Sequence, residues 1–172
     1  MEIKNPYEIC NCPIPNCGCS LGMQSYVDVY ADLIRTLRPQ LVLEWGPGRN
    51  TIMALQSGAR VVSIESEKRW IPDGANQRWT CILAQERSPD YLRLWGCDDA
   101  DIFFVDGRRR SECLAALHLM CKPSAVVCLH DAQRIRYQKA LGLFDFVEFR
   151  HRGFAVASKI ALPPAGGKKH VA

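Results

Sequence analysis

The chain has 172 residues, 48% of them apolar and 23% charged, and its formal net charge is +4. This length suits one domain and leaves no room for a catalytic domain beside a separate nucleotide-binding domain. No apolar run approaches the ~20 residues needed to span a bilayer, and the charge is too small to indicate a nucleic-acid partner. Residues 1–9 lack the apolar core of a signal peptide. We therefore expect a globular cytoplasmic protein with no membrane or nucleic-acid partner.

Residues 1–20 form a segment rich in cysteine and proline, with a C-x-C-x4-C-x-C pattern at Cys10, Cys12, Cys17 and Cys19. Four thiolates that converge on one ion can bind zinc, although C-x2-C is the commoner spacing. A zinc site, a cysteine-rich turn and a redox-sensitive loop therefore all stay open. The other cysteines lie mostly in apolar segments and are expected to be small core residues. They are Cys81, Cys97, Cys113, Cys121 and Cys128.

A helix is expected between Met23 and Leu37, where apolar residues recur at helical spacing before Pro39. We expect its tyrosines, Tyr26 and Tyr30, to pack in the core. Strands and helices then alternate along the chain. The expected strands cover residues 41–45, 61–65, 80–84, 101–105 and 125–129, and the expected helices cover 50–57, 110–121 and 133–141. This alternation predicts an α/β fold, in which a parallel sheet carries helices on both faces.

The end of the chain departs from this alternation. Residues 144–149 and 154–157 are rich in apolar side chains, and a short connection that contains Gly153 separates them. Such a connection predicts an antiparallel hairpin at the end of the sheet. We expect the folded domain to cover residues 21–160 and residues 161–172 to form a flexible tail.

The first strand and the residues after it are the most informative part of the sequence. Glu44 precedes two glycines, Gly46 and Gly48, and a helix is expected to begin near Asn50. Glycines let the backbone approach a ligand closely, and a helix N-terminus presents free backbone donors. The next strand ends in Glu65, whose carboxylate has two acceptor oxygens and so suits a vicinal diol. These features predict a site for a nucleoside ligand.

This arrangement resembles the class I S-adenosylmethionine-dependent methyltransferase fold, a Rossmann-like fold whose parallel strands are followed by a closing hairpin. The resemblance implies S-adenosylmethionine as cofactor, with Glu65 at the ribose hydroxyls and Gln85 or Glu86 near the adenine. It implies cofactor contacts at Glu44, Gly46, Gly48, Thr51, Glu65, Gln85 and Asp106. A nicotinamide-dinucleotide domain also uses glycines and an acid, but Thr51 stands in place of the third glycine of its G-x-G-x-x-G motif.

Chemistry is expected at the ends of the fourth and fifth strands. Asp106 follows the fourth strand and His130 and Asp131 follow the fifth, so these three catalytic candidates should face one crevice. The chain resembles small-molecule O-methyltransferases of the caffeoyl-CoA and macrocin type, in which acids at these two strand ends hold a divalent metal. Here His130 stands where a second acid is often found. A divalent metal on Asp106 and Asp131, a His130 base and a structural hydrogen bond of His130 all stay open.

Arginines lie close to these residues in the sequence. The triplet at residues 108–110 is expected to be the solvated start of a helix rather than a substrate site. Arg134, Arg136 and Tyr137 are candidates for holding an anionic or sugar-like substrate.

The expected function is transfer of a methyl group from S-adenosylmethionine to an oxygen, or as second choice a nitrogen, of a small molecule or glycan. Methylation of DNA adenine is disfavoured, because Asp106-Gly107-Arg108 stands where those enzymes carry an Asn/Asp-Pro-Pro-aromatic motif. Two alternatives stay open: a non-catalytic cofactor-binding or regulatory protein, and an NAD-binding oxidoreductase.

Overall fold

The computed structural model describes residues 26–71, 76–151 and 153–162. The N-terminal cysteine pattern and the chain from residue 163 onward lie outside these ranges. No helix within them is long and apolar enough to cross a bilayer.

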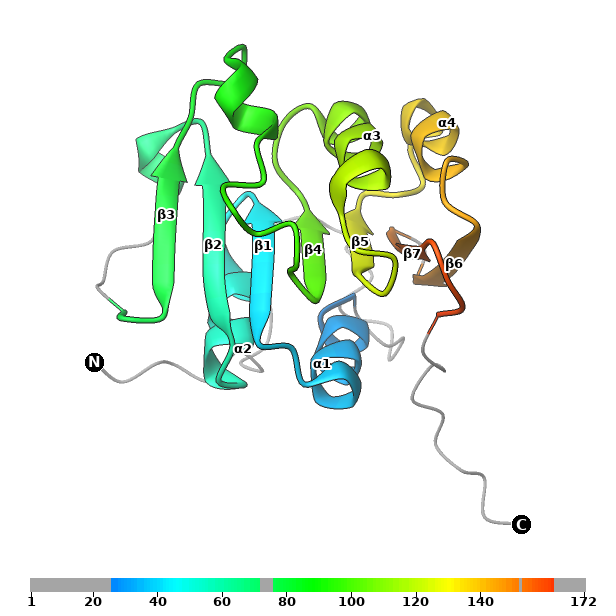
Figure 1. The fold of residues 1–172 in the computed structure, drawn as a ribbon, viewed down its shortest axis with the longest axis horizontal. Helices are drawn as coiled ribbons and strands as arrows, with labels where there is room; N and C mark the ends of the chain where they lie inside the picture. The colour runs from blue at the N-terminus through cyan, green and yellow to red at the C-terminus, as the bar shows by residue number, and fades with distance from the viewer. Residues whose placement is uncertain (1–25, 72–75, 152, 163–172) are drawn as a thin grey trace, which may run out of the picture.

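A seven-stranded sheet forms the centre of the molecule (Figure 1). Its order is β3-β2-β1-β4-β5-β7-β6, in which β1 to β5 are parallel and β7 is antiparallel to both β5 and β6. The strands are β1 (Leu41–Trp45), β2 (Arg60–Glu65), β3 (Trp79–Leu83), β4 (Ile102–Val105), β5 (Val126–His130), β6 (Phe146–His151) and β7 (Phe154–Ser158). The predicted parallel sheet with a closing antiparallel hairpin is confirmed, with strand ends that differ by one or two residues from those expected.

Helices cover both faces of the sheet, and each face has its own apolar core. Residues of α1 (Tyr26–Leu37) and α2 (Arg49–Gln56) pack on one face, where Tyr30 lies edge-on against Phe104 of β4 with ring centroids 4.8 Å apart. Residues of α3 (Arg110–Met120) and α4 (Gln138–Leu141) pack on the other face. The strands β1, β4 and β5 are buried on both sides, as their nearly continuous apolar sequences predict.

Short 3-10 helices replace some of the expected helical structure. They are η2 (Lys68–Trp70), η3 (Pro89–Leu92) and η4 (Ile135–Tyr137). The helix predicted over residues 133–141 is confirmed in part: helical structure covers residues 135–141, as the 3-10 helix η4 followed directly by the short α4. Asp131 adopts a left-handed backbone conformation (φ +58°), and Arg134 N then donates to the Asp131 carbonyl at 3.1 Å. Arg134 itself has extended backbone (ψ 124°), so helical structure begins only at Ile135.

The register of the strands determines which residues meet at the carboxyl edge of the sheet. Trp45 pairs with Ile64 and Val105, and Val105 pairs with Leu129. The residues that follow, Gly46, Asp106 and His130, therefore lie side by side at this edge.

The described cysteines are free thiols. Four of them are buried, as expected for core residues: Cys97, Cys113, Cys121 and Cys128. Cys81 departs from the expectation, since it is only half-buried on the edge strand β3.

Candidate active site

Gly46 and Gly48, the two glycines after β1, have different structural roles. Gly46 has φ +88°, and a Cβ there would lie 3.0 Å from the backbone nitrogen of Gly107. Both the backbone angle and the close approach therefore favour glycine. Gly48 has extended backbone (φ 178°), and a Cβ there would meet no atom within 4 Å. The loop at Gly48 thus borders open space, where a ligand can approach the backbone.

A hydrogen-bond network connects this loop to a buried acid. Glu44 is fully buried, and its Oε1 accepts hydrogen bonds from the hydroxyls of Thr51 and, at 2.5 Å, of Ser63. The Gly48 amide donates to Thr51 Oγ1 at 2.8 Å, and the Trp79 indole nitrogen donates to Ser63 Oγ at 2.8 Å. Thr51 was predicted as a cofactor contact. Its hydroxyl stabilises the loop, because it accepts from the Gly48 amide and donates to Glu44.

The second oxygen of Glu44, Oε2, is buried without a hydrogen-bond partner among the described residues. Burial raises the pKa of Glu44 to about 7, and the Ser63 and Thr51 hydroxyls oppose this rise. A buried acceptor without a partner costs about 1–3 kcal/mol. A cationic ligand group near Oε2 would supply both a donor and a charge that stabilises the carboxylate.

Glu65 at the end of β2 is also held by one oxygen only. Its Oε1 accepts from the amides of Ser66 and Glu67 at 2.5 and 2.9 Å, and from Ser66 Oγ at 3.2 Å. Within the described part of the chain, Oε2 accepts no hydrogen bond, although the residue is only 8% exposed. Gln85, expected near the adenine, lies exposed in the loop after β3, on the same edge.

Asp106 and His130 form a hydrogen-bonded pair at the ends of β4 and β5. His130 Nδ1 lies 2.9 Å from Asp106 Oδ1. The ring of Tyr26 lies against the imidazole in a tilted arrangement, with centroids 4.4 Å apart and an angle of 37° between the planes. The expectation that Tyr26 is plain core packing is therefore incomplete, since this side chain holds one face of His130.

Asp131, the third catalytic candidate, joins this pair through Arg110. The Arg110 guanidinium lies 2.9 Å from Asp106 Oδ1 through Nη2 and 3.3 Å from Asp131 Oδ2 through Nη1. Its side chain is only 13% exposed. The expectation that residues 108–110 are a solvated helix start is wrong for Arg110, because the two acids draw its side chain back over the strand ends. Arg108 is exposed, as expected.

These residues do not fit a divalent metal. Asp106 and Asp131 both face the Arg110 guanidinium, whose N–H groups donate hydrogen bonds and cannot act as metal ligands. His130 Nδ1 is already engaged by Asp106. Among the described residues, no three His, Cys, Asp or Glu side chains are grouped so that they could hold a metal ion.

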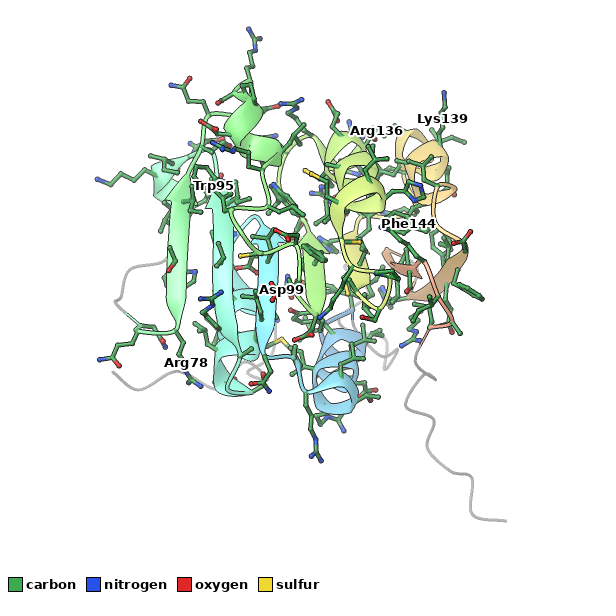
Figure 2. All side chains as sticks on the ribbon, in the orientation of Figure 1. Arg78, Trp95, Asp99, Arg136, Lys139 and Phe144 are labelled. Atoms are coloured by element: carbon green, nitrogen blue, oxygen red, sulfur yellow. The ribbon has the colours of Figure 1, made fainter. Side chains whose placement is uncertain are left out.

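Further cations line the same edge. Arg134 pairs with Asp131 at 2.7 Å, and Arg136 donates to the Tyr137 hydroxyl at 2.8 Å. Figure 2 shows Arg136 and Lys139 at the end of the molecule toward which β1 to β5 run. Neither pairs with a carboxylate within the described ranges, so both are available to an anionic group.

A hollow of about 640 Å³ lies elsewhere, between the segment after η3 and the end of α3. It is lined by Arg93, Leu94, Trp95, Gly96, Asp98 and Met120. It contains none of the predicted site residues, so we place the candidate site at the carboxyl edge, where the buried acids and the glycine loop meet.

Comparison with known structures identifies the fold of this chain. No family model matches the sequence, and a search of curated proteins finds no match. A Podospora anserina methyltransferase in its S-adenosylhomocysteine-bound form superposes with a TM-score of 0.60 at 12% identity, over 78% of each chain. A putative O-methyltransferase from Klebsiella pneumoniae has a TM-score of 0.59 at 15% identity, over 77% of this chain and 79% of that one. The chain has the class I methyltransferase fold.

A third similar structure contains a metal. MycE methyltransferase of the mycinamycin biosynthetic pathway, solved with Mg, S-adenosylhomocysteine and mycinamycin VI, has a TM-score of 0.56 at 17% identity. The superposition covers 78% of this chain and 45% of MycE.

Three parts of the site were missed by sequence reasoning. Arg110 follows Asp106 by four residues, and this spacing at a strand-to-helix junction was the available signal. Tyr26 gave none, because its contact with His130 joins residues that are 104 positions apart in the sequence. Gly107 was also missed: a Cβ there would lie 2.5 Å from the Tyr91 hydroxyl, so the loop after β4 can pass close to Trp45 only with glycine.

Proposed function

We propose that this protein is an enzyme that transfers a methyl group from S-adenosylmethionine to an oxygen of a small molecule or glycan. The observation that carries this proposal is the Asp106–His130 pair, which lies in register with Gly46 at the carboxyl edge of a class I methyltransferase sheet. In such sheets ligands bind outside the carboxyl ends of the strands.

The residues at β1 and β2 fit the cofactor. The free oxygen of Glu65 is suited to a ribose hydroxyl, because a carboxylate accepts well and Oε1 already has its donors. The partnerless Oε2 of Glu44 is suited to the ammonium group of the methionine part. The open space at Gly48 lets the backbone approach the ligand. When bound, S-adenosylmethionine supplies a sulfonium-activated methyl group.

His130 serves as the general base. The Asp106 carboxylate accepts the Nδ1 hydrogen, which leaves the lone pair of Nε2 to take a proton from the acceptor hydroxyl. Tyr26 packs on the imidazole and limits its rotation. Loss of this proton to His130 would make the hydroxyl oxygen a stronger nucleophile toward the methyl group that bound S-adenosylmethionine would supply. His130 then releases the proton to water.

The acceptor carries a negative group in this proposal. Arg136 of η4 and Lys139 of α4 are exposed cations without carboxylate partners in the described chain. A carboxylate, a phosphate or an acidic sugar on the acceptor would pair with them.

The first test is cofactor binding by calorimetry. We expect binding of S-adenosylhomocysteine and no binding of NAD at the same concentration. Preference for NAD would reject the assignment and favour the oxidoreductase.

The second test is transfer itself. The protein is incubated with methyl-labelled S-adenosylmethionine and pools of phenols, hydroxy acids and acidic sugars, and labelled products are separated from the cofactor. A methylated product that survives mild base would indicate a hydroxyl acceptor oxygen, whereas a product that releases methanol in mild base would indicate a carboxylate oxygen. Binding of S-adenosylhomocysteine without transfer to any pool would favour the non-catalytic alternative.

A further inference from the structure

The Arg110 guanidinium joins the ends of two neighbouring strands. Besides its contacts with the two acids, Nε donates to the Gly107 carbonyl at 3.0 Å. Nη1 donates to the His130 carbonyl at 2.6 Å, and Nη2 donates to the Asp106 carbonyl at 2.8 Å. Each guanidinium nitrogen therefore has an acceptor that belongs to β5 or lies within two residues of the end of β4.

The local structure around Arg110 is unfavourable by itself. Arg110 is the first residue of α3, where the positive end of the helix dipole disfavours a cation. The preceding residue, Arg109, has φ +49°, which is uncommon for a residue other than glycine. Neither feature follows from helix preferences. The contacts at the strand ends therefore determine where this side chain lies.

The charges of Asp106 and Asp131 explain why the contacts at the strand ends outweigh the unfavourable position of Arg110 at a helix N-terminus. Asp106 and Asp131 approach the same guanidinium, so without a cation between them the two carboxylates would repel each other. A guanidinium stays protonated at every pH at which the protein is folded. Arg110 is therefore a permanent cation in the position that a divalent ion would need.

We propose that Arg110 is a positioning residue that supplies the cation between Asp106 and Asp131, so that methyl transfer by this protein requires no divalent ion. The statement about methyl transfer rests on the proposed function. The statement about the cation does not, because it is tested by ion binding without turnover.

According to the proposal, Arg110 and a divalent ion cannot lie between Asp106 and Asp131 at the same time. Arg110→Ala removes the cation that Asp106 and Asp131 share. Asp131 then keeps only Arg134, whose side chain is 48% exposed and can move aside for an ion that prefers oxygen ligands, such as Mn²⁺. Arg110→Lys keeps a positive charge at the same place and still excludes the ion. These two variants separate loss of the charge from loss of the guanidinium shape.

The experiment is a Mn²⁺ titration of the full chain, followed by electron paramagnetic resonance of the free ion. Mn²⁺ is chosen because thiolates bind it poorly, which keeps the N-terminal cysteines from interfering. We expect no binding in wild type or Arg110→Lys, and about one equivalent in Arg110→Ala. Adding Asp131→Asn to Arg110→Ala should abolish that binding, and millimolar guanidinium should compete with it. Circular dichroism verifies that each variant is folded.

Two results would overturn the proposal. One is Mn²⁺ binding by the wild type that Asp131→Asn removes, a measurement that does not depend on whether Arg110→Ala folds. The other is a folded Arg110→Ala protein that binds no Mn²⁺. Once an acceptor is known, activity after dialysis against a chelator should be unchanged, and a loss restored by Mg²⁺ or Mn²⁺ would contradict metal independence. Failure to find an acceptor would count against the proposed function and leave the ion-binding result as it stands.

Discussion

The two halves of the carboxyl edge hold their acids in different ways. At β1 and β2, Glu44 and Glu65 each have one oxygen held by hydroxyls or backbone amides and one oxygen without a partner in the described chain. At β4 and β5, Asp106 and Asp131 are already paired with an internal cation, Arg110. The first half thus has acceptor oxygens that no described residue uses. The second half has its charge balanced internally and offers the imidazole of His130 instead.

The largest expected effect is the loss of turnover when His130 or Asp106, in the second half of the edge, is replaced. His130→Ala and Asp106→Asn should each slow turnover by ~100-fold or more, because one removes the base and the other its orienting acceptor. Initial rates with a known acceptor measure this, and calorimetry should show unchanged affinity for S-adenosylhomocysteine. His151→Ala, on the hairpin, is the control. Full activity in both variants would move the chemistry to the segment from Arg134 to Tyr137.

The second prediction concerns the pH dependence of stability that follows from the pKa of Glu44, the buried acid of the first half. The pKa of Glu44 is raised from 4.5 to about 7 in the folded protein, so the folded state keeps a proton that the unfolded state releases in this interval. Without cofactor, the contribution of Glu44 to the free energy of unfolding should therefore decrease as pH rises from 4.5 to about 7, by about 3 kcal/mol in total, and change no further above it.

Urea unfolding at several pH values measures this decrease. Glu44→Gln should remove most of it, whereas Glu148→Gln on β6 should leave it unchanged. An identical pH dependence in wild type and Glu44→Gln would show that Glu44 is ionised in the folded protein throughout this range.

A third prediction concerns the free oxygen of Glu65. Glu65→Ala should weaken S-adenosylhomocysteine binding by ~1.5–3 kcal/mol, since a ribose hydroxyl would lose a charged partner. Calorimetry measures the change. Glu67→Ala is a matched control, because only the backbone amide of Glu67 contacts Glu65. Equal effects of the two substitutions would show that the loop as a whole, and not the Glu65 carboxylate, determines affinity.

The smallest effect concerns the network behind the glycine loop. Trp79→Phe removes the indole donor to Ser63 Oγ and should lower the free energy of unfolding by about 1 kcal/mol. Trp70→Phe should have almost no effect, because Trp70 is 58% exposed. Urea unfolding of both variants makes the comparison. A loss as large for Trp70→Phe would indicate that ring size, rather than the hydrogen bond, matters at these positions.

The fold and the first half of the site could be predicted because their signals are local. Continuous apolar runs indicate strands buried on both faces, and a short connection indicates a hairpin. Glu44, Gly46 and Gly48 lie within five residues of one another, and Glu65 ends the next strand. These signals predicted cofactor contacts at Glu44 and Glu65, and the structure places the two acids at or next to the carboxyl ends of β1 and β2. Their contacts with a cofactor stay a prediction.

The second half of the site depended on the tertiary structure. Asp106 and His130 are 24 residues apart, and their hydrogen bond exists because the register of β4 and β5 brings the two strand ends together. By local preference Arg110 belongs to a solvated helix start, yet two acids from different strands draw it inward. Local sequence determines which segments become strands and helices. Burial and pairing of charges, which require the whole sheet, determine which of the arginines at its edge becomes part of the site.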